Sequence, residues 1–134
     1  DAIVAPRLVN PDGSPQEAGQ ALSTLGVPMP LVEPEASSPS GAMADYASAA
    51  CWLMTRSLHE RCGGFDPRFH PAYYEDTDLA MRVRLLGDGT IIADAEVVHF
   101  LGQSTADDKP RPMHEQRSIF CRLWERELRH QPAL

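Results

Sequence analysis

The chain has 134 residues, of which 43% are hydrophobic and 23% are charged, a composition that suits one globular domain with its own core. This composition excludes a disordered or collagen-like chain. The formal net charge of −7 argues against a general nucleic-acid binder, so we expect no nucleic-acid partner.

The first part of the chain predicts two strands separated by a long loop. Ala2–Val9 is a short apolar run that predicts a strand, and Asn10–Gly13 is a strong turn signal. Residues 14–44 are rich in proline, serine and glycine, which predicts a loop with one helical turn near Gln16–Leu22. The almost continuous apolar run Tyr46–Met54 predicts a buried strand.

Two helices are expected next. Ser57 and Glu60 have the spacing of a capping box, so a short helix should begin at Ser57, and Gly63-Gly64 should end it. Phe65–Tyr74 is rich in proline and aromatic residues and predicts a loop. Thr77–Leu86 has helical apolar spacing, and Gly87 marks its end.

The last third predicts further strand structure and an amphipathic helix. Thr90–Ala93 and Glu96–Phe100 indicate either two short strands or one kinked strand. Pro112–His130 predicts the helix, with an apolar stripe formed by Phe120, Trp124 and Leu128. This basic segment either faces phosphates or an anionic membrane surface or, as we favour, is simply a solvated helix face.

Cysteine usage and the ends of the chain bear on its setting. The three cysteines are widely spaced with no C-x-x-C pair, which argues against a zinc site or a disulfide framework and fits a reducing compartment. No apolar run is long enough to span a membrane. The chain begins without methionine in an apparent strand, so we expect a piece of a longer protein.

The densest group of chemically active residues precedes and opens the second predicted helix. Glu75, Asp76 and Asp78 crowd its start, directly after Tyr73-Tyr74. Such acids commonly cap helix amides and complement the helix dipole, which is one interpretation. The other is that a carboxylate held there acts as a general base toward a sugar hydroxyl.

Metal chemistry is the weaker interpretation of the same residues. Asp76 and Asp78 form a D-x-D triplet, which arises easily by chance, and His99 lies in an apolar strand without a neighbouring ligand motif. From the residues alone, His99 is better interpreted as a hydrogen-bonded structural residue. A small metal-dependent hydrolase using all three side chains is a further hypothesis, and it predicts that the chain alone binds a divalent metal.

Taken together, the motifs resemble the C-terminal half of family 2 glycosyltransferases, in the rhamnosyltransferase and galactofuranosyltransferase-like branch. The opening strand and turn also resemble the segment that follows the nucleotide-binding half of that family. The residues that carry the resemblance are Asp45–Met54, Gly63-Gly64-Phe65-Asp66, Tyr74–Leu79, Arg82, Gly87 and Val97-Val98-His99. The family usually has glycine where Ala49 stands, and its upstream D-x-D is missing from this chain.

The resemblance implies an α/β fold, namely the C-terminal part of a GT-A domain with a mixed sheet and flanking helices, incomplete without the N-terminal half. Residues 1–110 would form the acceptor-side half and 111–134 the basic helix. It further implies transfer of a sugar from a nucleotide-sugar donor, bound mainly by the missing half, to a glycan or lipid-linked acceptor hydroxyl during cell-envelope glycan synthesis. The location implied is the cytoplasm, with peripheral contact at the inner membrane face through the basic helix.

Specific roles follow from the same resemblance. Asp76 corresponds to the catalytic base and Glu75 to an acceptor-binding residue, while Tyr73, Tyr74 and Trp52 are candidates to stack on sugar rings. His99 corresponds to a ligand of a divalent cation, Mn²⁺ or Mg²⁺, that binds the donor diphosphate. We expect this chain alone to be inactive and, because a half fold exposes an unpaired sheet edge and an uncovered apolar face, either to form homodimers or to be marginally stable. The alternative from another class is a non-catalytic sugar-binding or assembly module.

Overall fold

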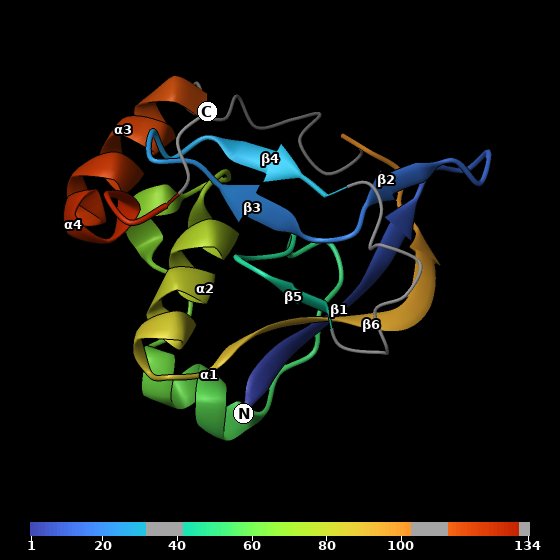
Figure 1. The fold of residues 1–134 in the computed structure, drawn as a ribbon, viewed down its shortest axis with the longest axis horizontal. Coiled ribbons are helices and arrows are strands. Elements are labelled where there is room, and N and C mark those ends of the chain that lie inside the picture. The colour runs from blue at the N-terminus through green and yellow to red at the C-terminus, as the bar shows by residue number, and fades with distance from the viewer. Residues whose placement is uncertain (32–41, 103–112, 132–134) are drawn as a thin grey trace.

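The computed structural model describes residues 1–31, 42–102 and 113–131, which form a mixed α/β fold (Figure 1). The strands are β1 (Ala2–Val9), β2 (Pro15–Glu17), β3 (Gln20–Leu22), β4 (Pro28–Pro30), β5 (Ala42–Ala44) and β6 (Gly89–Val98). The helices are α1 (Arg56–Cys62), the 3-10 turn η1 (Pro67–Phe69), α2 (Glu75–Leu85), α3 (Met113–Leu123) and α4 (Glu125–Leu128).

The main sheet has the strand order β2-β1-β6-β5 and is built on a parallel pair. β1 pairs with β6 from Ala2 opposite Gly89 to Val9 opposite Val98, while β2 and β5 are antiparallel to their neighbours. The register shifts between Ala5 and Arg7, so β6 is one irregular strand and not two. This confirms the predicted strand at residues 2–9 and, of the two alternatives for β6, the single kinked strand.

Two different segments meet the edge of β1 that faces away from β6. Val4 exchanges two backbone hydrogen bonds of 2.8 Å with Leu53, and Leu8 pairs with Glu17 of β2. Between them Pro6 has no N–H to leave unpaired, which suits an edge position. The predicted strand at Tyr46–Met54 is wrong, because the segment touches the sheet only through isolated bridges and Leu53 is 73% exposed.

Residues 14–31 are not the loop that composition predicts. They contain β2 and the antiparallel β3–β4 pair, in which Ala21 lies opposite Met29. The helical turn expected near Gln16–Leu22 is wrong, because Gly19 adopts a left-handed φ of 84° and separates two short extended segments. Residues 32–41 lie outside the described part of the chain.

The helix boundaries follow local capping signals with some shifts. The N-cap of α1 is Thr55, whose hydroxyl oxygen accepts a hydrogen bond of 3.1 Å from the Leu58 N–H, so the expected cap at Ser57 is wrong by two residues. Gly63 ends α1 in the left-handed conformation, as predicted. The C-terminal helix is two helices, α3 and α4, broken at Trp124, and Pro112 lies outside the described residues.

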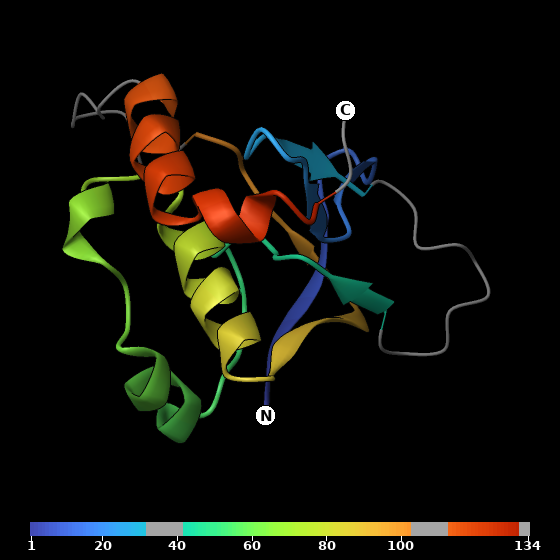
Figure 2. The ribbon, with the colours of Figure 1, turned by 60° about the vertical axis from the view of Figure 1, so that its left-hand side comes forward.

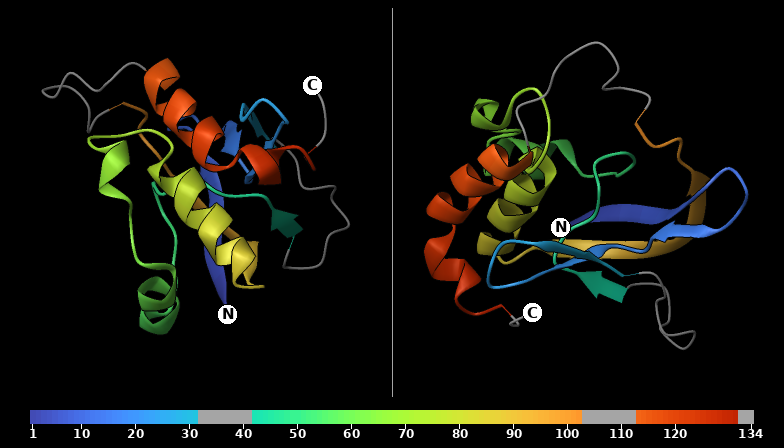
Figure 3. Two further views of the ribbon diagram at one scale, coloured as in Figure 1. Left: turned by 90° about the vertical axis from the view of Figure 1, so that its left-hand side faces the viewer. Right: turned by 90° about the horizontal axis from the view of Figure 1, so that it is seen from above.

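The core lies between the main sheet and the helices, which gather on one side of the molecule (Figures 2 and 3). α2 is central, with Leu79 and Val83 fully buried, and α3 and α4 pack across it. The predicted apolar stripe of Phe120, Trp124 and Leu128 is confirmed, since all three side chains are buried in this core. This packing fixes the start of α2, where the candidate site lies.

Candidate active site

The backbone at the start of α2 has an uncommon conformation. Tyr73 and Tyr74 both have positive φ angles, 78° and 70°, which are costly for residues with side chains and need support from their surroundings. Tyr74 has that support: its ring packs on Phe120 at 5.1 Å and its hydroxyl donates a 2.9 Å hydrogen bond to the Gly26 carbonyl. With 5% exposed, Tyr74 belongs to the core and offers no surface on which a sugar ring could stack.

Asp76 follows this turn, and backbone and side-chain donors orient its carboxylate. Oδ1 accepts hydrogen bonds from the Thr77 N–H at 2.7 Å and the Thr77 hydroxyl at 3.2 Å. Oδ2 accepts one from the Ala49 N–H at 3.3 Å. Burial raises the pKa of Asp76, an effect that these hydrogen bonds partly oppose. The protein thus holds a carboxyl group in a fixed orientation and makes it more basic than an exposed aspartate.

Glu75 is the second acid of the site. Its side chain is half-buried, and its Oε2 has no hydrogen-bond partner within the described residues. Burial, followed by the nearby Asp76 carboxylate, raises the pKa of Glu75. Two neighbouring carboxyl groups with raised pKa values are a common feature of acid–base sites, although structural clusters produce them too.

Glu17 is a third acid at this site, and sequence analysis did not identify it. It lies in β2, where its Oε1 accepts a 2.7 Å hydrogen bond from the Ser48 N–H and its Oε2 accepts another from the Gln20 amide. It therefore holds the segment whose next N–H, that of Ala49, binds Asp76. One sequence signal was present: Glu17 is the only charged residue between Asp12 and Glu33.

Aromatic side chains lie on the same segment. The ring of Trp52 stacks on that of Phe65, with centroids 6.2 Å apart and an interplanar angle of 16°. Trp52 is partly buried, whereas Phe65 is 47% exposed, so this pair presents an aromatic face to solvent. Tyr73 is also partly exposed and packs on the edge of the core.

His99 follows β6 at the end of the main sheet. Its backbone N–H donates to the Val9 carbonyl at 2.9 Å, and its Nδ1 lies 2.7 Å from Oε1 of Gln16. α2 runs back along the sheet into β6, and Figure 1 shows the start of α2 among the helices and the end of β6 beside β2, on the other side of the molecule. β2 links the two groups, since Gln16 contacts His99 and Glu17 holds the segment beside Asp76.

The D-x-D triplet does not form a pair of metal ligands. Both oxygens of Asp78 are used inside the protein, one by the Trp124 indole N–H at 2.8 Å and the other by Arg82 at 2.7 Å. Among the described residues, no three His, Cys, Asp or Glu side chains are grouped so that they could hold a metal ion. Within the described residues, a cation bound by His99 would therefore need its other ligands from elsewhere.

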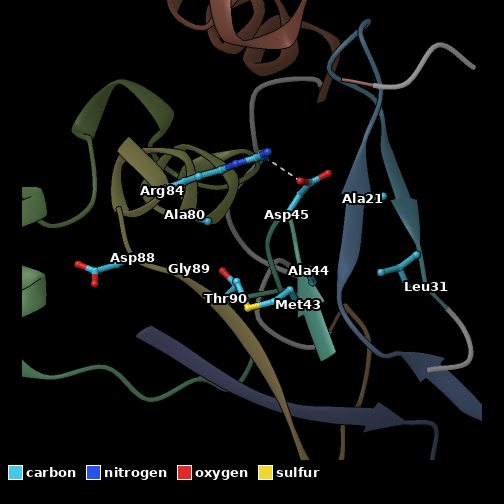
Figure 4. Close-up of a pocket in the computed structure, with 10 residues that line it drawn as sticks. All are labelled: Ala21, Leu31, Met43, Ala44, Asp45, Ala80, Arg84, Asp88, Gly89 and Thr90. Atoms are coloured by element: carbon cyan, nitrogen blue, oxygen red, sulfur yellow. Dashed lines mark hydrogen bonds and ion pairs between the residues drawn. The ribbon is translucent and has the colours of Figure 1, made fainter. Parts of the chain in front are cut away.

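A separate pocket of about 370 Å³ is lined by residues of α2, β3, β5 and the start of β6 (Figure 4). Its walls are mostly apolar, and Arg84 reaches across them to Asp45, with a 2.7 Å hydrogen bond. Asp88 points away from the other side chains, toward the N-terminal amino group and Arg61. The pocket's charges are thus already paired within the protein, and we assign it no ligand.

Comparison with known proteins adds no family. The sequence matches no model of a known protein family, and no curated protein matches it. Within the described residues, no helix has the length and apolar character needed to cross a membrane.

Proposed function

We propose that this chain is the acceptor-side part of an inverting glycosyltransferase with a GT-A-type fold, and that Asp76 is its general base. The observation that carries this proposal is the Asp76 carboxyl group, oriented by Ala49 and Thr77 and made more basic by burial. A general base works best when its pKa approaches the working pH, so raising an aspartate pKa favours this role.

In the proposed reaction, Asp76 removes the proton from a hydroxyl group of the acceptor sugar. The hydroxyl oxygen then forms a bond to the anomeric carbon of a nucleotide-sugar donor, and the bond from that carbon to the diphosphate breaks. The nucleoside diphosphate leaves with the electron pair, and in-line attack inverts the anomeric centre. Glu75 would accept a hydrogen bond from the acceptor, a role that its unpartnered Oε2 within the described chain supports.

The donor is proposed to bind mainly through a nucleotide-binding part that this chain does not contain. A divalent cation, Mn²⁺ or Mg²⁺, would offset the charge that develops on the leaving diphosphate, and His99 would supply one of its ligands. Trp52 and Tyr73, which are both partly exposed, are the remaining aromatic candidates for contact with the acceptor sugar.

The test uses the full-length protein with a panel of nucleotide-sugar donors, because release of nucleoside diphosphate can be measured whichever sugar is transferred. We expect Asp76→Asn to lower the rate at least about 100-fold, since a general base contributes roughly 10²–10⁴-fold. Its thermal unfolding temperature should fall only modestly, because the asparagine oxygen can still accept both hydrogen bonds from Thr77 and only the longer bond from the Ala49 N–H, at 3.3 Å, is lost. Loss of folding with full activity per folded molecule would contradict the proposal.

A non-catalytic sugar-binding or assembly module is the second candidate, and one observation favours it. The stacked Trp52–Phe65 pair, with Phe65 47% exposed, is an aromatic face that needs no catalytic acid to bind a sugar face or a partner. Under this alternative, Phe65→Ser removes binding of a glycan panel, whereas Asp76→Asn leaves that binding intact. Glycan binding that is lost with Asp76→Asn and kept with Phe65→Ser would argue against the module.

A further inference from the structure

The turn between β1 and β2 contains a chain of polar side chains with a defined direction. Asp12 accepts hydrogen bonds from the backbone N–H of Ser14 at 2.9 Å and from its hydroxyl at 2.6 Å. Both bonds hold the pKa of Asp12 below its usual value, so this carboxylate acts only as an acceptor. The Ser14 hydroxyl proton therefore points to Asp12, and its oxygen accepts a 3.0 Å hydrogen bond from the amide NH₂ of Asn10.

The next link passes from Asn10 to Gln16 in β2. The Asn10 amide oxygen accepts a 2.8 Å hydrogen bond from Nε2 of Gln16. The same Nε2 also lies 3.2 Å from the backbone carbonyl oxygen of His99, which can only accept. Two acceptors on one side of the amide fix Nε2 as its NH₂ group, which leaves Oε1 facing the His99 ring.

The last link determines which ring nitrogen of His99 carries the proton. Oε1 of Gln16 lies 2.7 Å from Nδ1 of His99, and an amide oxygen cannot donate. We infer that neutral His99 is held in the Nδ1–H tautomer by the directed chain Asp12–Ser14–Asn10–Gln16, which leaves the Nε2 lone pair available. No described residue forms a hydrogen bond with Nε2.

This tautomer is the opposite of the one that a neutral imidazole favours in water. The chain of hydrogen bonds must therefore stabilise the Nδ1–H form relative to the Nε2–H form. Reversing the proton on His99 would set the Nδ1 lone pair against the amide oxygen of Gln16. Turning that amide would then place its NH₂ against Nδ1 but set its oxygen against Asn10 and the His99 carbonyl. Gln16 is therefore a positioning residue for the Nε2 lone pair.

A histidine that binds a metal or accepts a proton commonly donates its other N–H to a fixed acceptor, which orients the ring. His99 meets this requirement, and its backbone is held on β1 by the Val9 carbonyl. The tautomer itself depends only on the contacts described above. Its use as a cation ligand rests on the proposed function, so the two can fail separately.

The test is a ¹⁵N–¹H correlation spectrum of the histidine rings in the ¹⁵N-labelled chain at about pH 8, above the ordinary imidazole pKa of about 6.5. We expect the His99 signal to be that of the Nδ1–H tautomer, with the other four histidines as references in the same spectrum. In Gln16→Leu the signal should change to that of the Nε2–H form. An Nε2–H or averaged His99 in the unsubstituted chain, or an unchanged signal in Gln16→Leu, overturns the inference.

A milder pair of variants covers the case in which Gln16→Leu does not fold. Ser14→Ala breaks the chain in an exposed turn, so the Nδ1–H fraction of His99 should fall. Ser118→Ala, whose hydroxyl bonds only a carbonyl of its own helix, should leave it unchanged. If the Nδ1–H fraction of His99 is equal in the two variants, the hydrogen-bond chain from Asp12 does not determine the tautomer, and the inference is overturned.

Mn²⁺ added to the labelled chain then separates this inference from the proposed function. Selective broadening of the His99 ring signals supports a cation ligand on Nε2 and, with it, the available lone pair. An Nδ1–H signal that Mn²⁺ does not affect supports the tautomer and counts against the cation in the proposed function.

Discussion

The substitution Asp78→Asn tests whether the second acid of the D-x-D triplet is structural. Asp78 is buried, with 3% of its side chain exposed, and it joins α2 to the C-terminal helices through the Trp124 indole. It also forms an ion pair with Arg82, one turn further along α2. Asparagine can still accept from Trp124, but its NH₂ group meets the guanidinium, so the ion pair is lost.

The expected loss of stability depends on the hydrogen bonds and solvent exposure that Arg82 retains when the ion pair is broken. Removing one partner of a buried ion pair costs about 3–5 kcal/mol, because the other charge stays buried without compensation. The side chain of Arg82 is 24% exposed and still donates to the Cys62 and Gly64 carbonyls, which softens the loss. We therefore expect Asp78→Asn to lower the free energy of unfolding by about 2–4 kcal/mol.

The assay is urea unfolding of the chain, followed by tryptophan fluorescence. Glu125→Gln is the matched control, because Glu125 and Arg129 form the same kind of ion pair, one turn apart, with both side chains 71% exposed. This control should change stability by no more than about 0.5 kcal/mol. A loss below about 1 kcal/mol for Asp78→Asn, or equal losses for the two variants, would refute the reasoning.

Three further predictions concern the site and the core. Burial raises the pKa of Asp76, so the stability that this group contributes is complete below its ordinary pKa of 3.8 and is lost as pH rises through the raised value. The free energy of unfolding of Asp76→Asn, relative to that of the unsubstituted chain, should therefore increase from about pH 3 to about pH 7. A difference that stays flat or falls in urea unfolding over this pH range would contradict the prediction. Gly26→Ala should lower thermal stability by more than Gly13→Ala does. Both glycines have a positive φ, but only at Gly26 would the new Cβ lie 2.7 Å from Cys121 Sγ. Equal losses of stability in the two variants would show that this close contact has no energetic cost. Phe120→Ala should cost about 3–5 kcal/mol in urea unfolding because the ring is fully buried, and a loss below about 2 kcal/mol would show that the core closes around the space.

Features with strong local signals could be predicted from the sequence. The strand Ala2–Val9, the Gly63 helix end and the stripe containing Phe120 depend on contiguous or periodic residues, and each is present. The acids Glu75 and Asp76 could likewise be placed at a helix start, because that placement needs only their own neighbourhood.

Features set by distant contacts could not be predicted in this way. The three-residue strands β2 to β5 are too short for a periodic pattern, and the apolar run Tyr46–Met54 is compatible with a strand or with a loop folded against the core. Glu17 and Ser48 are 31 positions apart, and only the folded chain brings them together. The contact of Asp78 with Trp124 follows from how the C-terminal helices pack on α2, which local sequence does not determine.

The parallel β1–β6 pair also constrains the order in which the protein folds. Arg7 and Asp94, which form a hydrogen bond across the irregular point of this pair, are 87 residues apart in sequence. During synthesis β2 can pair with β1 soon after it, but the parallel partner β6 begins only at Gly89, so the main sheet cannot be completed from its N-terminal end. Closing so long a loop before its contacts form predicts slow folding, in which helix α2 and its immediate contacts form first and β1 docks late.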